Sequence, residues 1–130
     1  MKELDFTIRE AVNEPIKEYR SNSPEKLSLK NKINELKSEV FDIPIIINGQ
    51  EIRTGETGEC VMPHNHKHVL AKYHKAGEKE VKMAIDNLLE TWKNWSNTSL
   101  KNRIEIFQNM ADLLQGPYRD LINASTMLGQ

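Results

Sequence analysis

The stretch IPIIINGQEIRTG, from Ile43 to Gly55, decides the fold class that this sequence predicts. Three consecutive isoleucines, Ile45 to Ile47, are β-branched and favour a strand. Asn48-Gly49 follows them and is the strongest two-residue hairpin signal, because both residues tolerate positive φ. Gln50 to Arg53 return as a second strand, so the stretch predicts an antiparallel hairpin.

Two more strands are expected directly after this hairpin. The glycines in residues 54–58 indicate a loop. Glu59 to Met62 and Val69 to His74 then have the composition of strands, joined by a turn from Pro63 to His68. With the first hairpin they make a small antiparallel sheet of three or four strands.

In the sequence, helices are expected both before and after these strands. The first begins at Ser23-Pro24-Glu25, where serine caps the free amides and proline suits the first helical position, and Pro44 stops it. Three more helices are expected after the strands. The second begins at Gly77 and ends before Ser96 to Ser99, which supply caps for the third. The third ends at Gln115, and the fourth runs from Tyr118 to about Leu128. Each helix carries an apolar stripe, and the third helix is expected to bury its own, although the short sheet is not expected to cover all four stripes completely. The four stripes are Leu29, Ile33, Leu36 and Val40; Val81, Ala84, Ile85, Leu88, Trp92 and Trp95; Leu100, Ile104, Phe107, Ala111 and Leu114; and Leu121, Ile122 and Leu128.

The predicted fold class is therefore α+β, with an N-terminal helix, a small antiparallel β-hairpin sheet and then three helices. Residues 1–22 show little periodicity and are expected to form an extended N-terminal arm. Residues 23–130 are expected to form the folded part, with a core that is marginal for a chain of this length.

Composition excludes several classes of protein. The 130 residues carry a formal net charge of -1, so no large field attracts nucleic acid or anionic lipid. No apolar run approaches the roughly 20 residues of a membrane span. One cysteine forms no internal disulfide, and the N-terminus resembles neither a signal peptide nor a mitochondrial presequence. We expect a cytoplasmic protein without nucleic-acid or membrane partners.

The cysteine and all four histidines fall within one stretch, CVMPHNHKHVLAKYH, as Cys60, His64, His66, His68 and His74. Their spacing matches none of the usual zinc-ligand pairs. A reactive thiolate needs a helix N-terminus or a nearby cation, and Cys60 lies in a predicted strand. We therefore expect an exposed polar turn and a structural cysteine, with a Cys/His metal-binding module as the less favoured alternative.

Signals for nucleotide binding are weak. Gly55 and Gly58 bracket a loop, but no helix follows them to present its N-terminus to a phosphate. Trp92 and Trp95 lie at helical spacing, which is more typical of core anchors than of a stacking platform. The residues alone thus predict no catalytic, cofactor-binding or metal site.

The motifs taken in order resemble a known family: VNEP, SPE, IPIIINGQEIRTG, MPHNHKHVLAKYHKA, AIDNLLETWKNW and RIEIFQNMADLLQGPYRDLINASTMLGQ. From Val12 to Gln130 the chain resembles the N-terminal region of the delta-1-pyrroline-5-carboxylate dehydrogenases, within the aldehyde dehydrogenase superfamily. The resemblance implies part of an α/β aldehyde dehydrogenase fold. It also implies a homo-oligomeric enzyme of proline catabolism that oxidises L-glutamate gamma-semialdehyde to glutamate with NAD.

The same resemblance places the family's NAD-binding strands, catalytic cysteine, catalytic glutamate and oligomerisation strand beyond Gln130. Cys60 does not match the family's nucleophile, so no catalytic or cofactor-binding residue is carried onto this chain. We therefore expect a fragment that is inactive alone, with the remainder of the same enzyme as its partner. The alternative is a non-enzymatic interaction or complementation segment, which would bind a partner through uncovered apolar stripes.

Overall fold

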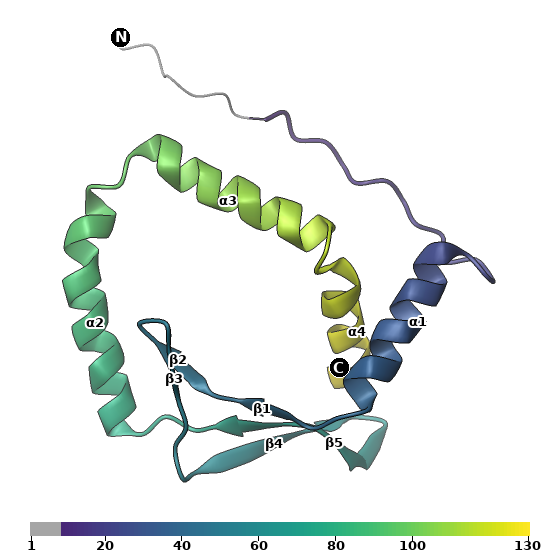
Figure 1. Cartoon of the computed structure of the whole chain (residues 1–130), viewed down its shortest axis with the longest axis horizontal. Coiled ribbons are helices and arrows are strands. Elements are labelled where there is room, and N and C mark those ends of the chain that lie inside the picture. The colour runs from purple at the N-terminus through teal and green to yellow at the C-terminus, as the bar shows by residue number, and fades with distance from the viewer. Residues whose placement is uncertain (1–8) are drawn as a thin grey trace.

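The computed structural model describes residues 9–130 and confirms the α+β class (Figure 1). None of the described helices is long and apolar enough to cross a membrane. In chain order the elements are α1 (Pro24–Lys37), β1 (Phe41–Ile43), β2 (Ile45–Ile47), β3 (Gln50–Ile52), β4 (Thr57–Met62), β5 (Asn65–His74), α2 (Glu78–Ser96), α3 (Leu100–Gln115) and α4 (Arg119–Gly129).

Helix α1 begins as predicted and ends earlier than predicted. The Ser23 hydroxyl accepts a hydrogen bond from the Lys26 amide at 3.4 Å, and proline occupies the first turn. At the other end Ser38 donates to the Glu35 carbonyl, from its amide at 3.0 Å and from its hydroxyl at 2.6 Å. The helix thus stops well before Pro44, and the expectation that Val40 belongs to its stripe is wrong, because Val40 lies outside the helix and is exposed.

Both predicted hairpins are present and antiparallel. Asn48 and Gly49 have φ angles of 51° and 70°, as the tight turn between β2 and β3 requires. The second turn is shorter than predicted: β4 ends at Met62 and β5 already begins at Asn65. His66 and His68 therefore lie in a strand and not in a turn.

The hairpins belong to two separate sheets instead of one. β2 pairs with β3 alone, whereas β5 is the centre of a sheet with strand order β1-β5-β4. β1 runs parallel to β5, with Phe41 opposite Ala71, and was not predicted. A strand of three residues is too short to show a period, and its parallel partner is distant in the sequence.

The core lies where α1 and α4 pack on the β4–β5 hairpin. Met62, Leu70 and Leu128 form the buried cluster, and Ile33 and Leu36 of α1 pack against it. This confirms the stripes of the first and last helices at Ile33, Leu36 and Leu128. Ile122, predicted in the stripe of the last helix, is exposed, so that part of the prediction is wrong. Ala124 of α4 is fully buried, although the sequence pattern did not single it out.

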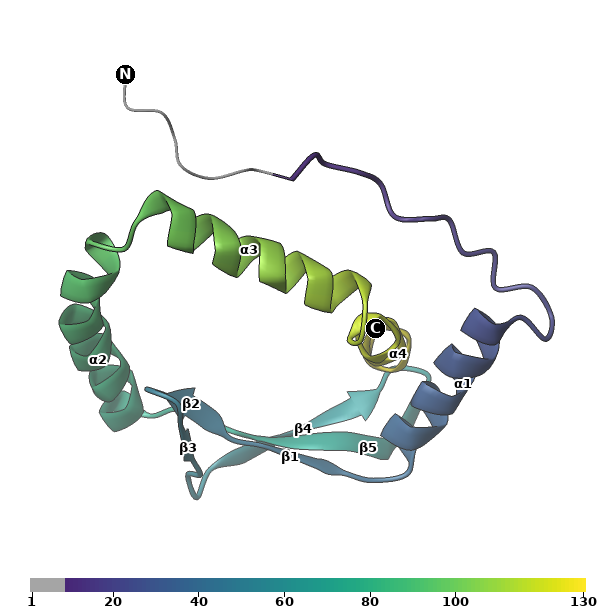
Figure 2. The ribbon, with the colours of Figure 1, turned by 45° about the horizontal axis from the view of Figure 1, so that its top comes forward.

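The predicted burial of the α3 stripe, and the prediction that Trp92 and Trp95 are core anchors, are wrong for the described part of the chain. Neither α2 nor α3 has a buried residue. Trp92 is 64% exposed and Phe107 is 68% exposed, so the tryptophan stripe does not anchor a core here. Figures 1 and 2 show why: the sheet, α2, α3 and α4 follow one another around an open frame, and α2 packs chiefly against β2.

Residues 9–20 contain no helix or strand and run alongside α3 (Figure 2). The Arg9 guanidinium donates to both carboxylate oxygens of Asp112, at 2.9 and 2.7 Å. Further along, Glu14 pairs with Arg119 of α4. The rest of the predicted arm, residues 1–8, lies outside the described residues.

Candidate functional site

The cysteine and the histidines do not form one cluster. In the β4–β5 ladder Cys60 lies opposite Ala71 and Thr57 lies opposite His74. His64 is in the turn at the other end of β5, about 30 Å from His74 at the usual rise of a strand. Within residues 9–130 no three His, Cys, Asp or Glu side chains gather where they could hold a metal ion. The geometry thus gives the metal-binding alternative no support.

His74 instead belongs to a polar junction between three strands. Its Nε2 lies 3.1 Å from Oδ1 of Asp42 in β1. Its Nδ1 lies 2.9 Å from the amide nitrogen and 2.7 Å from the carbonyl oxygen of Thr54, just after β3. Nδ1 accepts a hydrogen bond from the amide when it carries no proton, and donates one to the carbonyl when it carries a proton. The imidazole therefore has a partner at both ring nitrogens, whether or not the ring is charged.

Arg53 completes this junction from the β3 side. Its Nε donates to Oδ2 of Asp42 at 2.6 Å, and its Nη1 donates to Glu51 at 2.9 Å. The hydrogen bond from Arg53 lowers the pKa of the Asp42 carboxyl, and the hydrogen bond from His74 acts in the same direction. These partners account for every charged group in the junction, which favours a structural role over a catalytic one. Only pairing across sequence-distant strands brings these residues together, so no local signal pointed to them.

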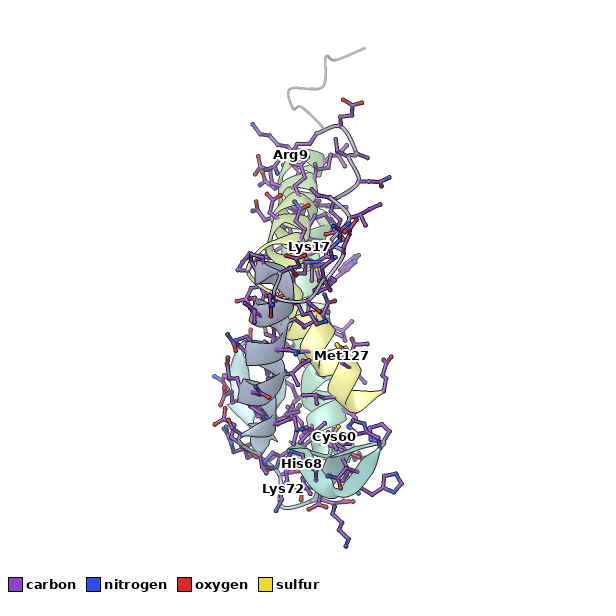
Figure 3. The ribbon with its side chains drawn as sticks, turned by 90° about the vertical axis from the view of Figure 1, so that its right-hand side faces the viewer. Arg9, Lys17, Cys60, His68, Lys72 and Met127 are labelled. Carbon is purple, nitrogen blue, oxygen red and sulfur yellow. The ribbon has the colours of Figure 1, made fainter. Side chains whose placement is uncertain are left out.

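Cys60 lies beside an apolar groove. The groove has a volume of about 510 Å³ and lies between α1, β1, the β4–β5 hairpin and α4. Figure 3 shows Cys60 and His68 at the sheet end of the molecule, with Met127 of α4 above them. Residues that line the groove include Leu36, Phe41, Cys60, Leu70, Leu121 and Leu128.

The setting of Cys60 does not suit a nucleophile. It is exposed in the middle of β4 and is not at a helix N-terminus. The charged side chain among the residues that line its groove is Asp42, a carboxylate, which gives no electrostatic support to a thiolate. We assign Cys60 to the wall of the groove.

The two glycines of the predicted loop do not fit a nucleotide cofactor. A Cβ on Gly58 would lie 2.4 Å from Cζ of Tyr73, so this glycine makes room for the tyrosine ring. Gly55 faces open space, and the element that follows the loop is β4 and not a helix. This loop therefore does not lead into a helix N-terminus of the kind that binds a dinucleotide phosphate.

Arg103 fixes the corner between α2 and α3. Its guanidinium lies 5.5 Å from the ring centroid of Trp95 and donates to the carbonyls of Trp95 and Ser96, at 3.2 and 3.0 Å. These bonds satisfy free carbonyls at the end of α2. Trp95 is thus held in place, while Trp92 in the turn before it stays uncovered. The position of Arg103 in the first turn of α3, facing a helix end, is a signal that sequence reasoning missed.

Comparison with known proteins assigns this arrangement to a family. Residues 51–128, from β3 to the end of α4, match the sequence pattern described as "Aldehyde dehydrogenase family". The chain belongs to the aldehyde dehydrogenase family. The match includes the β4–β5 hairpin and the three C-terminal helices, which confirms the resemblance inferred from the motifs.

Among curated aldehyde dehydrogenases, the chain is similar to proteins named for one reaction. It is 37% identical over 126 residues to the delta-1-pyrroline-5-carboxylate dehydrogenase of Agaricus bisporus, which covers 96% of this chain and 23% of that protein. It is 38% identical over 127 residues to the probable delta-1-pyrroline-5-carboxylate dehydrogenase of Schizosaccharomyces pombe, covering 97% and 23%. The chain thus spans less than a quarter of the length of these relatives.

Solved aldehyde dehydrogenase structures contain the same arrangement of elements. The delta-pyrroline-5-carboxylate dehydrogenase of Mycobacterium tuberculosis bound with NAD superposes with a TM-score of 0.92 and 30% identity, over 100% of this chain and 24% of that one. The 1-pyrroline-5-carboxylate dehydrogenase from Thermus with bound NAD superposes with a TM-score of 0.79 and 22% identity, over 89% of this chain and 22% of that one. At this identity the comparison supports the fold alone. The open frame is therefore part of a larger fold in those proteins.

Proposed function

We propose that this chain supplies the N-terminal scaffold of an NAD-dependent dehydrogenase that oxidises L-glutamate gamma-semialdehyde, the open form of pyrroline-5-carboxylate, to glutamate in proline catabolism. The observation that carries the proposal is the superposition of the whole chain on a dehydrogenase of that name, at a TM-score of 0.92. The role of these residues is to form the frame on which the remainder of the subunit folds.

In this proposal the chain alone has no dehydrogenase activity. An aldehyde dehydrogenation needs a nucleophile, a hydride acceptor and donors for the oxyanion, held together in one site. Cys60 lacks an activating neighbour, and the glycine loop does not suit a dinucleotide phosphate. We derive no chemical step from these residues, because they bind neither the aldehyde nor the cofactor in this proposal.

A covalent chimera tests whether the chain serves as the scaffold of such an enzyme. Residues 1–130 replace the matching quarter of the Mycobacterium tuberculosis enzyme within one polypeptide, and NADH formation is followed with pyrroline-5-carboxylate. We expect turnover that depends on this substrate, with the unaltered enzyme as the positive control. A chimera that folds and binds NAD but does not turn over the substrate would contradict the proposal.

A second assay tests the inactivity of the isolated chain. Purified residues 1–130 are incubated with pyrroline-5-carboxylate and NAD, and NADH is measured against a blank without protein. We expect no difference from the blank. Turnover above the blank that is lost in Cys60→Ser would instead make Cys60 a nucleophile.

The exposed apolar helices support a second function for the chain, as an interaction or complementation segment. Large apolar side chains such as Leu88, Trp92 and Phe107 are more than 60% exposed, and large exposed apolar patches mark interaction sites. This function is compatible with the first, because the partner can be the part of the dehydrogenase that the chain does not contain.

A further inference from the structure

The accessible surface of the chain is unusually large. It measures 10726 Å² for a mass of 15.0 kDa. A compact monomer of that mass has about 7,000 Å², so the chain exposes roughly half as much again. The excess, roughly 3,700 Å² on one side, is more than one partner's share of most obligate interfaces, which bury about 2,000–5,000 Å² over both partners.

Part of this surface is formed by apolar side chains of α2 and α3. We call it the α2–α3 face and define it by Val81, Ile85, Leu88, Trp92, Phe107 and Leu114, all of them exposed. These side chains recur at helical spacing on two consecutive helices. A stripe of this kind is typical of a helix that packs against another element. Within the described residues the arm approaches its α3 part, where Arg9 lies near Phe107 and Glu14 near Leu114, but both apolar side chains stay exposed.

The Cys60 groove is a second uncovered apolar surface. It opens between α1, β1 and α4, next to the buried cluster of Met62, Leu70 and Leu128. An apolar side chain placed in the groove would extend this core directly. The groove is also the part of the surface that carries the single thiol of the chain, which makes its burial measurable.

The solved structures show that this frame can be part of a longer chain. The same frame occurs at a TM-score of 0.92 in a protein of which it makes up only 24%. We propose that the α2–α3 face and the Cys60 groove dock the remaining three quarters of an aldehyde dehydrogenase subunit, and that they do so when this part is a separate polypeptide. The inference rests on the proposed function and specifies the partner of the chain.

Co-expression tests the inference without an assay of activity. Residues 1–130 are co-expressed with the Mycobacterium tuberculosis enzyme from which the matching quarter is deleted, and a tag on the larger part is used for purification. We expect a one-to-one complex. We also expect the Cys60 thiol to react with a maleimide several-fold more slowly in the complex than in the isolated chain, as read by mass spectrometry of its peptide.

A pair of variants locates the contact. Leu88→Glu adds one negative charge to the α2–α3 face and should weaken the complex about tenfold or more, as truncation of a central interface residue does. Lys79→Gln changes the net charge by the same unit on the opposite side of α2 and should leave affinity unchanged. Leu88 is 66% exposed in the chain, so its replacement does not disturb the chain's own folding.

Two results would overturn the inference. One is a failure of the two parts to co-purify. The other is a homodimer of residues 1–130 in which Cys60 is already protected, since a second copy would then be the occupant. A complex without turnover would contradict the proposed function and leave the docking intact. An active chimera, together with separate parts that form no complex, would support the proposed function and contradict the docking.

Discussion

His74 and Asp42 lie 32 positions apart in the sequence, and the imidazole Nε2 of one is 3.1 Å from a carboxylate oxygen of the other. This contact joins the end of β5 to β1, and Arg53 extends it to the end of β3. The junction therefore fixes how the two sheets meet. Its stabilising effect depends on the ionisation of Asp42.

The first prediction concerns acid. Because Arg53 and His74 lower the pKa of Asp42 in the folded chain, the ionised carboxylate stabilises the fold above the ordinary aspartate pKa of about 4. That stabilisation is lost as the pH falls through the lowered value. Asp42→Asn should reduce the urea midpoint of unfolding at neutral pH, and its difference from the unaltered chain should shrink as the pH falls below the ordinary aspartate pKa and through the lowered one.

The matched control for this prediction is Asp86→Asn in α2, for which the described residues supply no ion pair. It should shift the midpoint little at neutral or at acidic pH. An Asp42→Asn effect of equal size at neutral and at acidic pH would mean that the junction acts through packing and not through charge.

The second prediction concerns the loop glycines. A Cβ on Gly58 would meet the Tyr73 ring at 2.4 Å, so Gly58→Ala should lower the free energy of unfolding by about 1 kcal/mol as the ring is displaced. Gly55→Ala, where a Cβ meets open space, should leave it unchanged or raise it slightly. In a double-mutant cycle with Tyr73→Ala the penalty of Gly58→Ala should disappear, and a penalty that persists would argue against the clash.

The third prediction concerns the small core. Leu128→Ala should reduce the free energy of unfolding by about 2–4 kcal/mol, because Leu128 belongs to the buried cluster. Ile122→Ala, on the exposed side of α4, should cost less than about 1 kcal/mol. Thermal unfolding by circular dichroism measures both, and equal effects would show that the cluster does not carry the stability of the isolated chain.

The fourth prediction concerns the arm. Arg9→Ala removes the pair with Asp112 and should speed tryptic cleavage after Lys17 about two- to fivefold, the range expected for an exposed ion pair. High salt should speed cleavage of the unaltered chain in the same way. Glu10→Gln, which removes a charge from the same segment, serves as the control. If neither Arg9→Ala nor high salt changes the rate of cleavage, the ion pairs do not hold the arm in place.

The features that sequence reasoning predicted correctly depend on near neighbours. The Asn48-Gly49 turn, the Ser23 cap of α1 and the Ser99 cap of α3 are each set by a few adjacent residues. The features it missed depend on distant partners. β1 becomes a strand because β5 lies beside it, and the junction of His74 with Asp42 exists only in the folded chain.

The burial of the α3 stripe and of the α2 tryptophans was predicted wrongly for a related reason. An apolar stripe such as Leu88 and Trp92 shows that a face is suited to packing, but its cover can be another part of a larger fold. The family was recognised from motifs, and the comparisons confirm it. The absence of catalytic and cofactor-binding residues, the oligomeric partner and the cytoplasmic location stay predictions.

The parallel pairing of β1 with β5 has a consequence for how the chain is made. The β4–β5 hairpin forms across a short local turn, whereas β1 can pair only after β5, which contains the partner Ala71 of Phe41, has been synthesised. At the usual rate of about 5–20 residues per second, β1 leaves the ribosome roughly 2 to 6 seconds before its partner. During that interval β5, the strand that pairs with β1 in the folded chain, has not yet been made, so β1 can join this sheet only after β5 is present.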